Sequence, residues 1–118
     1  MKKNRRELDK LVEKYLKMYP YINKEKVGSL TKDQLIVICI DEILKIMPEK
    51  EVIFVKYRYF KGWSIVKIAS EMSYSQRMIY IIRKKALIKI YHGISHLLYS
   101  SDKDLDVVRK QYNLSIWR

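Results

Sequence analysis

Hydrophobic residues recur at helical spacing along most of this 118-residue chain, and no stretch shows the alternation and turn signals of a β-hairpin. The first helix is predicted over residues 5–18, with a hydrophobic stripe made of Leu8, Leu11, Val12, Tyr15 and Tyr19. Pro20 predicts the end of this helix, because proline disfavours helical geometry in the residue before it. The pattern as a whole predicts an all-α protein, with a connection over residues 20–30.

Local signals mark the limits of the next two helices. Thr31 begins the sequence Thr-Lys-Asp-Gln, which has the form of a capping box and predicts a helix over residues 31–46. Pro48 suits the first turn of the following helix, where its missing N–H group has no helical partner to lose. Gly62 predicts that this third helix stops near residue 60.

A short helix, a tight turn and a longer basic helix are predicted next. Ser64 is the expected cap of a helix over residues 65–72. Ser75 is the expected cap of a longer helix that begins at Gln76 and extends to His92 or beyond. Only about three residues separate the two helices, and this spacing is typical of a helix-turn-helix.

The longer helix has two chemically different faces. Its core-facing stripe consists of Ile79, Ile82, Ala86, Leu87 and Ile90. The other face carries Gln76, Arg77, Tyr80, Ile81 and Lys84, with Arg83 and Lys85 beside it. An α-helix fits the major groove of B-form DNA, and a recognition helix reaches base edges with its N-terminal residues. The arrangement therefore predicts a double-stranded DNA-binding helix.

Each polar residue of this face has a plausible DNA contact. Arg77 can donate two hydrogen bonds to guanine, and Gln76 can pair with adenine. Ile81 can meet a thymine methyl group. The first turn, at Ser75, offers free backbone N–H groups to a phosphate. The residues expected at phosphates are Tyr80, Lys84 and Lys85. The alternative for the basic run at residues 83–85 is an ordinary solvated face.

Composition agrees with a polyanionic partner. The chain has 25 basic and 13 acidic residues, a formal charge of +12, which favours nucleic acid or an anionic membrane surface. No apolar run is long enough to cross a membrane, and the apolar face of the basic helix is needed for the core. Cys39 is the only cysteine, so we expect a small core residue, no intrachain disulfide and a cytoplasmic protein.

Residues 46–90 read IMPEKEVIFVKYRYFKGWSIVKIASEMSYSQRMIYIIRKKALIKI. This stretch resembles the −35-element-binding region of sigma-70-class sigma factors, and more closely the phage and prophage late-gene activators built on that module. The resemblance implies a transcriptional regulator in a bacterial host that binds promoter DNA and contacts RNA polymerase. It also implies a small residue at Ala69, where two helices cross.

The resemblance also assigns roles within the longer helix. It implies base-reading by Gln76, Arg77 and Ile81, and backbone or edge contacts by Tyr80, Arg83, Lys84 and Lys85. Two positions depart from the family. Ser73 stands where glycine is usual, which requires an unusual backbone conformation or a different turn. Ile81 replaces a commonly polar residue, so the DNA site need not be a standard −35 hexamer.

The remaining signals are weaker. We divide the chain into residues 1–46, 47–99 and 100–118, the last a short amphipathic helix with a tail. Its apolar residues, expected to pack on the domain or on a partner, are Leu105, Val108, Tyr112 and Trp117. Trp63 is expected to anchor against the third helix. His92 and His96 have metal-ligand spacing but no completing ligand nearby, and the alternate aspartates at residues 102–106 lack the rest of a calcium loop.

Several functional classes remain open. The chain shows no nucleophile–base pair, phosphate-binding glycine loop or paired carboxylates, so we expect neither an enzyme nor a cofactor. The alternatives to a transcriptional regulator are a DNA-recognition subunit of a phage packaging machine and a helical module that binds only protein. A second copy of the chain is a further candidate partner.

Overall fold

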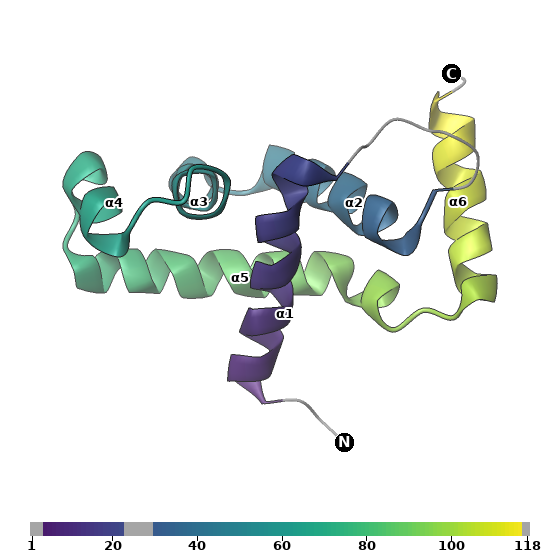
Figure 1. Ribbon diagram of the computed structural model, residues 1–118, viewed down its shortest axis with the longest axis horizontal. Helices are drawn as coiled ribbons and strands as arrows, with labels where there is room; N and C mark the ends of the chain where they lie inside the picture. The colour runs from purple at the N-terminus through teal and green to yellow at the C-terminus, as the bar shows by residue number, and fades with distance from the viewer. Residues whose placement is uncertain (1–3, 23–29, 117–118) are drawn as a thin grey trace.

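Helix α5 (Gln76–Leu98) is the axis on which most of the other helices pack. In the computed structural model, which describes residues 4–22 and 30–116, α2 (Lys32–Ile46), α3 (Glu49–Val55) and α4 (Ile65–Met72) lie along one side of α5. Helix α1 (Arg5–Met18) crosses α5 near its middle (Figure 1). Helix α6 (Asp102–Ile116) stands at the far end. No strand occurs within the described ranges, so the predicted all-α class is confirmed.

The predicted helix starts are confirmed at the level of individual hydrogen bonds. Thr31 Oγ1 accepts from the backbone N–H of Gln34 at 3.1 Å, and Gln34 Oε1 accepts from the N–H of Thr31 at 2.8 Å. Ser64 and Ser75 cap α4 and α5 in the predicted way, each through its hydroxyl oxygen. These caps satisfy N–H groups that have no partner inside the helix.

The third helix changes geometry part of the way along. It was predicted as one helix to about residue 60, and the structure continues α3 as a π-helical segment, η2 (Lys56–Phe60). The N–H of Lys61 closes this segment on the carbonyl of Lys56 at 3.0 Å. Gly62 then takes a positive φ of 71°, which glycine adopts without a steric penalty. The predicted stop at Gly62 is thus confirmed, and the wider turn before it was not foreseen.

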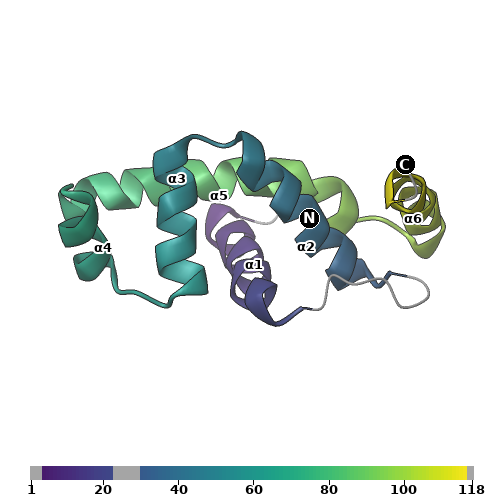
Figure 2. The same cartoon turned by 90° about the horizontal axis from the view of Figure 1, so that it is seen from above.

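The residues after α1 form a short 3₁₀ turn, η1 (Tyr19–Tyr21), with Pro20 in its first positions. The ring of Tyr19 stacks on Phe60 at 4.4 Å between centroids, so the end of α1 is held against η2. Figure 2 shows α1 and α3 side by side in front of α5. Most of the predicted connection over residues 20–30 lies outside the described residues.

A single hydrophobic cluster joins all parts of the chain. It includes Val12 of α1, Ile36 of α2, Phe54 of α3, Ile82 of α5 and Leu105 of α6. The three segments distinguished in the sequence therefore contribute to one core. No helix in the described part of the chain is long and apolar enough to cross a membrane.

Helix α6 adds the C-terminal part of that core. Leu105 is buried and Val108 is half-buried against the cluster, as predicted for the C-terminal helix. Arg109 Nε donates to the carbonyl of Leu30 at 2.6 Å and so ties α6 to the start of α2. Of the other residues predicted to pack here, Trp117 and the side chain of Tyr112 lie outside what the structure describes.

Candidate nucleic-acid interface

The turn between α4 and α5 is built around Ser73. Ser73 has φ 59° and ψ 40°, the left-handed conformation that the sequence required of a serine at this position. The N–H of Tyr74 donates to the carbonyl of Ala69 at 3.0 Å and closes the end of α4. Ala69 itself is buried on α4, which packs against α5. The short helix, three-residue turn and longer helix therefore have the expected order and spacing.

The two faces of α5 are separated as predicted. The buried side chains include the whole predicted stripe of Ile79, Ile82, Ala86, Leu87 and Ile90. The exposed residues include Gln76, Arg77, Tyr80, Ile81, Lys84 and Lys85. Tyr80 is 54% exposed and Ile81 is 41% exposed, which is unusual for large apolar side chains on a well-packed helix. The first turns of α5 thus present a mixed polar and apolar surface to solvent.

Arg83 does not belong to this exposed surface. Its Nη2 lies 2.9 Å from Glu13 Oε1, and its Nη1 lies 4.0 Å from Asp9 Oδ2, so the side chain reaches towards α1. Tyr59 donates to the other oxygen of Glu13 at 2.6 Å. The structure therefore brings Arg83 to the junction of α1, α5 and η2 and separates it from the other predicted DNA contacts.

Two pKa values reflect this junction. Burial would lower the pKa of Arg83, but the nearby Glu13 carboxylate and the other groups around it outweigh burial and raise it. Burial, reinforced by the Glu13 carboxylate, raises the pKa of Tyr59. Arg83 is thus firmly charged and Tyr59 is firmly protonated. A sequence signal for this position existed, because Arg83 stands four residues from both Ile79 and Leu87 of the buried stripe.

The basic residues of α5 divide into paired and unpaired groups. Lys89 Nζ lies 2.8 Å from both carboxylate oxygens of Glu51 on α3, and Glu51 is only 2% exposed. Within the described residues, the side chains of Arg77, Lys84 and Lys85 have no ion-pair partner. The internal pairs stabilise the packing of α5, whereas the unpaired charges remain available to a ligand.

Trp63 packs where α4 begins. Its ring stacks on Tyr57 of η2 at 4.2 Å between centroids, and its N–H donates to the carbonyl of Tyr57 at 2.9 Å. Lys67 Nζ lies 4.1 Å from the Trp63 ring centroid, within the range of a cation–π interaction. The predicted anchor against the third helix is therefore confirmed, although Trp63 is half-buried and not fully internal.

Two weaker candidates show no functional geometry. His92 and His96 are both exposed, and the described part of the chain contains no cluster of three or more His, Cys, Asp or Glu residues suited to a metal. Cys39 Sγ donates to the carbonyl of Gly93 at 3.4 Å, and burial raises the pKa of its thiol. Because the thiolate is the reactive form, Cys39 has the character of a packing residue, as expected.

No protein-family model matches the chain, and no curated protein or solved structure matches it significantly. The functional interpretation therefore depends on the exposed start of α5 and its surroundings.

Proposed function

We propose that this protein binds double-stranded DNA by placing the N-terminal half of α5 in the major groove. The observation that carries the proposal is the exposed and unpaired face of Gln76, Arg77, Tyr80, Ile81 and Lys84, directly after a tight turn and a supporting helix. The opposite face of α5 is buried, so the helix is held rigidly while this face stays free. Such a rigid support favours base recognition.

The proposed roles follow from the chemistry and position of each side chain. Arg77 donates to guanine O6 and N7, and Gln76 pairs with adenine N6 and N7. Ile81 contacts a thymine methyl group. The backbone N–H groups of Gln76 and Arg77 bind a phosphate, since the Ser75 hydroxyl already satisfies Met78. The side chains proposed at phosphates are Tyr80, Lys84 and Lys85, and Arg83 acts as a positioning residue towards α1.

The biological role proposed is transcriptional regulation, in particular activation of phage or prophage genes at promoters together with RNA polymerase. This part of the proposal is supported by the resemblance of residues 46–90 to the −35-binding region of sigma factors. The left-handed Ser73, the buried Ala69 and the order of α3, α4 and α5 are compatible with that resemblance. Ile81 implies that the preferred DNA site differs from a standard −35 hexamer.

Selection of bound sequences from random duplex DNA, at two salt concentrations, tests the proposal. We expect the wild-type protein to enrich a defined motif and Arg77→Ala to lose or relax one position of it. One bidentate contact to guanine contributes about 1–3 kcal/mol of discrimination, so the preference at that base pair should fall by roughly 5- to 150-fold.

Lys103→Ala is the matched control, because it removes one exposed positive charge from α6, far from α5's first turns. It should leave the motif intact. Binding that enriches no motif and simply weakens with salt would contradict base reading and leave a general grip on phosphates. Absence of DNA binding would contradict the whole proposal and favour a module that binds only protein.

A further inference from the structure

A groove separates the N-terminal half of α1 from the recognition half of α5. It has a volume of about 450 Å³ and is lined by Arg5, Arg6, Asp9, Lys10 and Glu13 of α1 and by Arg83 of α5. Helices α2, α3 and α4 lie along one side of α5, and the N-terminal half of α1 extends beyond α5 on the other side (Figure 1). The exposed face of α5 points away from α2–α4, so it shares a side of the molecule with this part of α1.

The acidic groups of the groove are already neutralised. Asp9 Oδ1 lies 3.0 Å from Arg5 Nε, and Glu13 accepts hydrogen bonds from both Arg83 and Tyr59. Glu7, the other acidic residue in this half of α1, does not line the groove. Internal pairs therefore account for both carboxylates, and they do not reduce the charge of the remaining basic residues.

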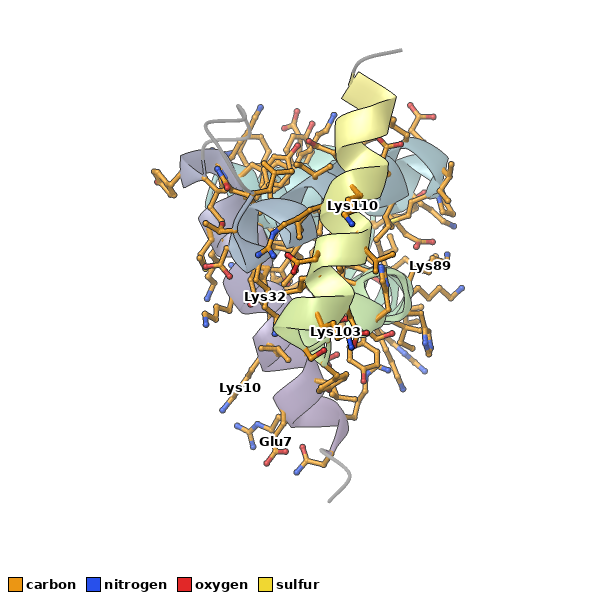
Figure 3. The ribbon with its side chains drawn as sticks, turned by 90° about the vertical axis from the view of Figure 1, so that its right-hand side faces the viewer. Glu7, Lys10, Lys32, Lys89, Lys103 and Lys110 are labelled. Atoms are coloured by element: carbon orange, nitrogen blue, oxygen red, sulfur yellow. The ribbon has the colours of Figure 1, made fainter. Side chains whose placement is uncertain are left out.

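Arg6 and Lys10 are the basic residues left over. Both are exposed, and neither has an ion-pair partner within residues 4–22 and 30–116. They are four residues apart and so lie on one face of α1. Figure 3 shows Lys10 projecting into solvent from the N-terminal half of α1. Two fixed cations thus stand on the wall of the groove.

The groove adjoins the proposed DNA-binding face directly. Arg5 Nη2 donates to the backbone carbonyl of Lys84 at 3.3 Å, so the first turn of α1 touches α5 where its exposed face ends. The Glu13–Arg83 pair, one turn away on α5, holds α1 at this angle. The position of Arg6 and Lys10 relative to Arg77 and Lys84 is therefore set by the fold and not by flexible side chains alone.

We infer that the N-terminal half of α1 is a second DNA-binding element, in which Arg6 and Lys10 bind phosphates beside the site occupied by α5. The inference rests on the proposed function. Phosphate contacts fix the register and orientation of a protein on the duplex without reading sequence. A helix that crosses the recognition helix and projects along its exposed side can supply such contacts to the flanking backbone. The partner surface is thus duplex DNA longer than the stretch covered by α5.

The test is the double variant Arg6→Ala with Lys10→Ala, measured for binding to the selected duplex over a range of salt. Each lost phosphate contact lowers the slope of log affinity against log salt by about 0.9. Two contacts make the loss of affinity between about 50 and 200 mM salt roughly tenfold smaller than in the wild type. The preferred motif should be unchanged.

The matched control is Lys103→Ala with Lys110→Ala, which removes the same charge from α6 (Figure 3). An equal loss of salt dependence in the two double variants would overturn the inference, because only net charge would then matter. A changed motif would also overturn it, since Arg6 or Lys10 would then read bases. If the wild-type protein binds no DNA, the proposed function fails. If Arg77→Ala relaxes the motif and Arg6→Ala with Lys10→Ala changes nothing, only the inference fails.

Discussion

Ser73 carries the turn of the candidate site on a residue that is poorly suited to it. A non-glycine residue in the left-handed region pays roughly 1–2 kcal/mol through the close approach of its Cβ to the following carbonyl. The turn persists because α4 and α5 are both anchored in the core on either side of it. The strain is therefore local, and a substitution that relieves it should leave both helices in place.

Ser73→Gly should stabilise the protein by about 0.5–1 kcal/mol. Glycine removes the strain of the left-handed conformation, and part of this gain is offset by the greater entropy of glycine in the unfolded chain. Chemical denaturation followed by circular dichroism measures the difference. Ser70→Gly, an exposed position within α4, is the control and should destabilise by about 0.5–1 kcal/mol. Equal destabilisation by both substitutions would show that Ser73 is not strained.

At the level of elements, α2 and α5 approach each other closely at Gly93. A Cβ atom at this position would lie 2.2 Å from Ile43 Cδ1 and 2.8 Å from Ile43 Cγ1. Cys39 on α2 also reaches the carbonyl of Gly93. Glycine is needed here for the space it leaves and not for an unusual backbone, since Gly93 lies inside the helix. This contact fixes how far α2 can descend onto α5.

Gly93→Ala should destabilise the protein by about 1 kcal/mol. Overpacking costs typically 1–3 kcal/mol, and the better helix propensity of alanine returns about 1 kcal/mol. Thermal and denaturant unfolding measure the net change. Adding Ile43→Val, which removes the atom closest to the new methyl group, should recover part of the loss. A Gly93→Ala protein more stable than the wild type would mean that Ile43 rotates aside without a penalty.

At the scale of the whole molecule, Glu13 joins the N-terminal helix to both the recognition helix and η2. Its carboxylate binds Arg83 at one oxygen and the Tyr59 hydroxyl at the other. Tyr59 is 6% exposed, and its hydroxyl must stay protonated to donate to Glu13. The arrangement of α1 relative to α5 therefore depends on the protonation state of a buried phenol.

The stability of the fold should fall as pH rises above 10, with Tyr59 as one cause. The pKa of Tyr59 is raised above its ordinary value of 10.0, so the unfolded chain releases this proton first and unfolding becomes more favourable with increasing pH. One such group contributes at most about 1.4 kcal/mol per pH unit. Tyr59→Phe should make the decline between pH 10 and about pH 12 shallower in denaturant titrations.

Some decline should remain in Tyr59→Phe, because burial and the nearby Asp33 also raise the pKa of Tyr15. Tyr80→Phe, at an exposed position, is the control and should follow the wild-type curve. A Tyr59→Phe protein with the same pH dependence as the wild type would contradict a role for the Tyr59 proton.

The sequence by itself determined the elements and most of their limits. Thr31, Ser64 and Ser75 are caps, and Gly62 ends η2, because each acts on groups within a few residues along the chain. The two faces of α5 followed from the 3.6-residue period alone, and the exposed candidates Gln76, Arg77, Tyr80, Ile81, Lys84 and Lys85 were named correctly as exposed. Local geometry suffices for such predictions.

Only the tertiary structure decided which charges are free and which are internal. Nothing local distinguishes Arg83 from Lys84, yet Arg83 meets Glu13 seventy residues away and Lys84 meets solvent. Nothing local shows that Glu51 is buried against Lys89, that Gly93 touches Ile43, or that Arg6 and Lys10 stand beside α5. These contacts depend on how α1, α2 and α3 cross α5. Crossing geometry results from side-chain packing across the whole core, and it leaves no signature in neighbouring residues.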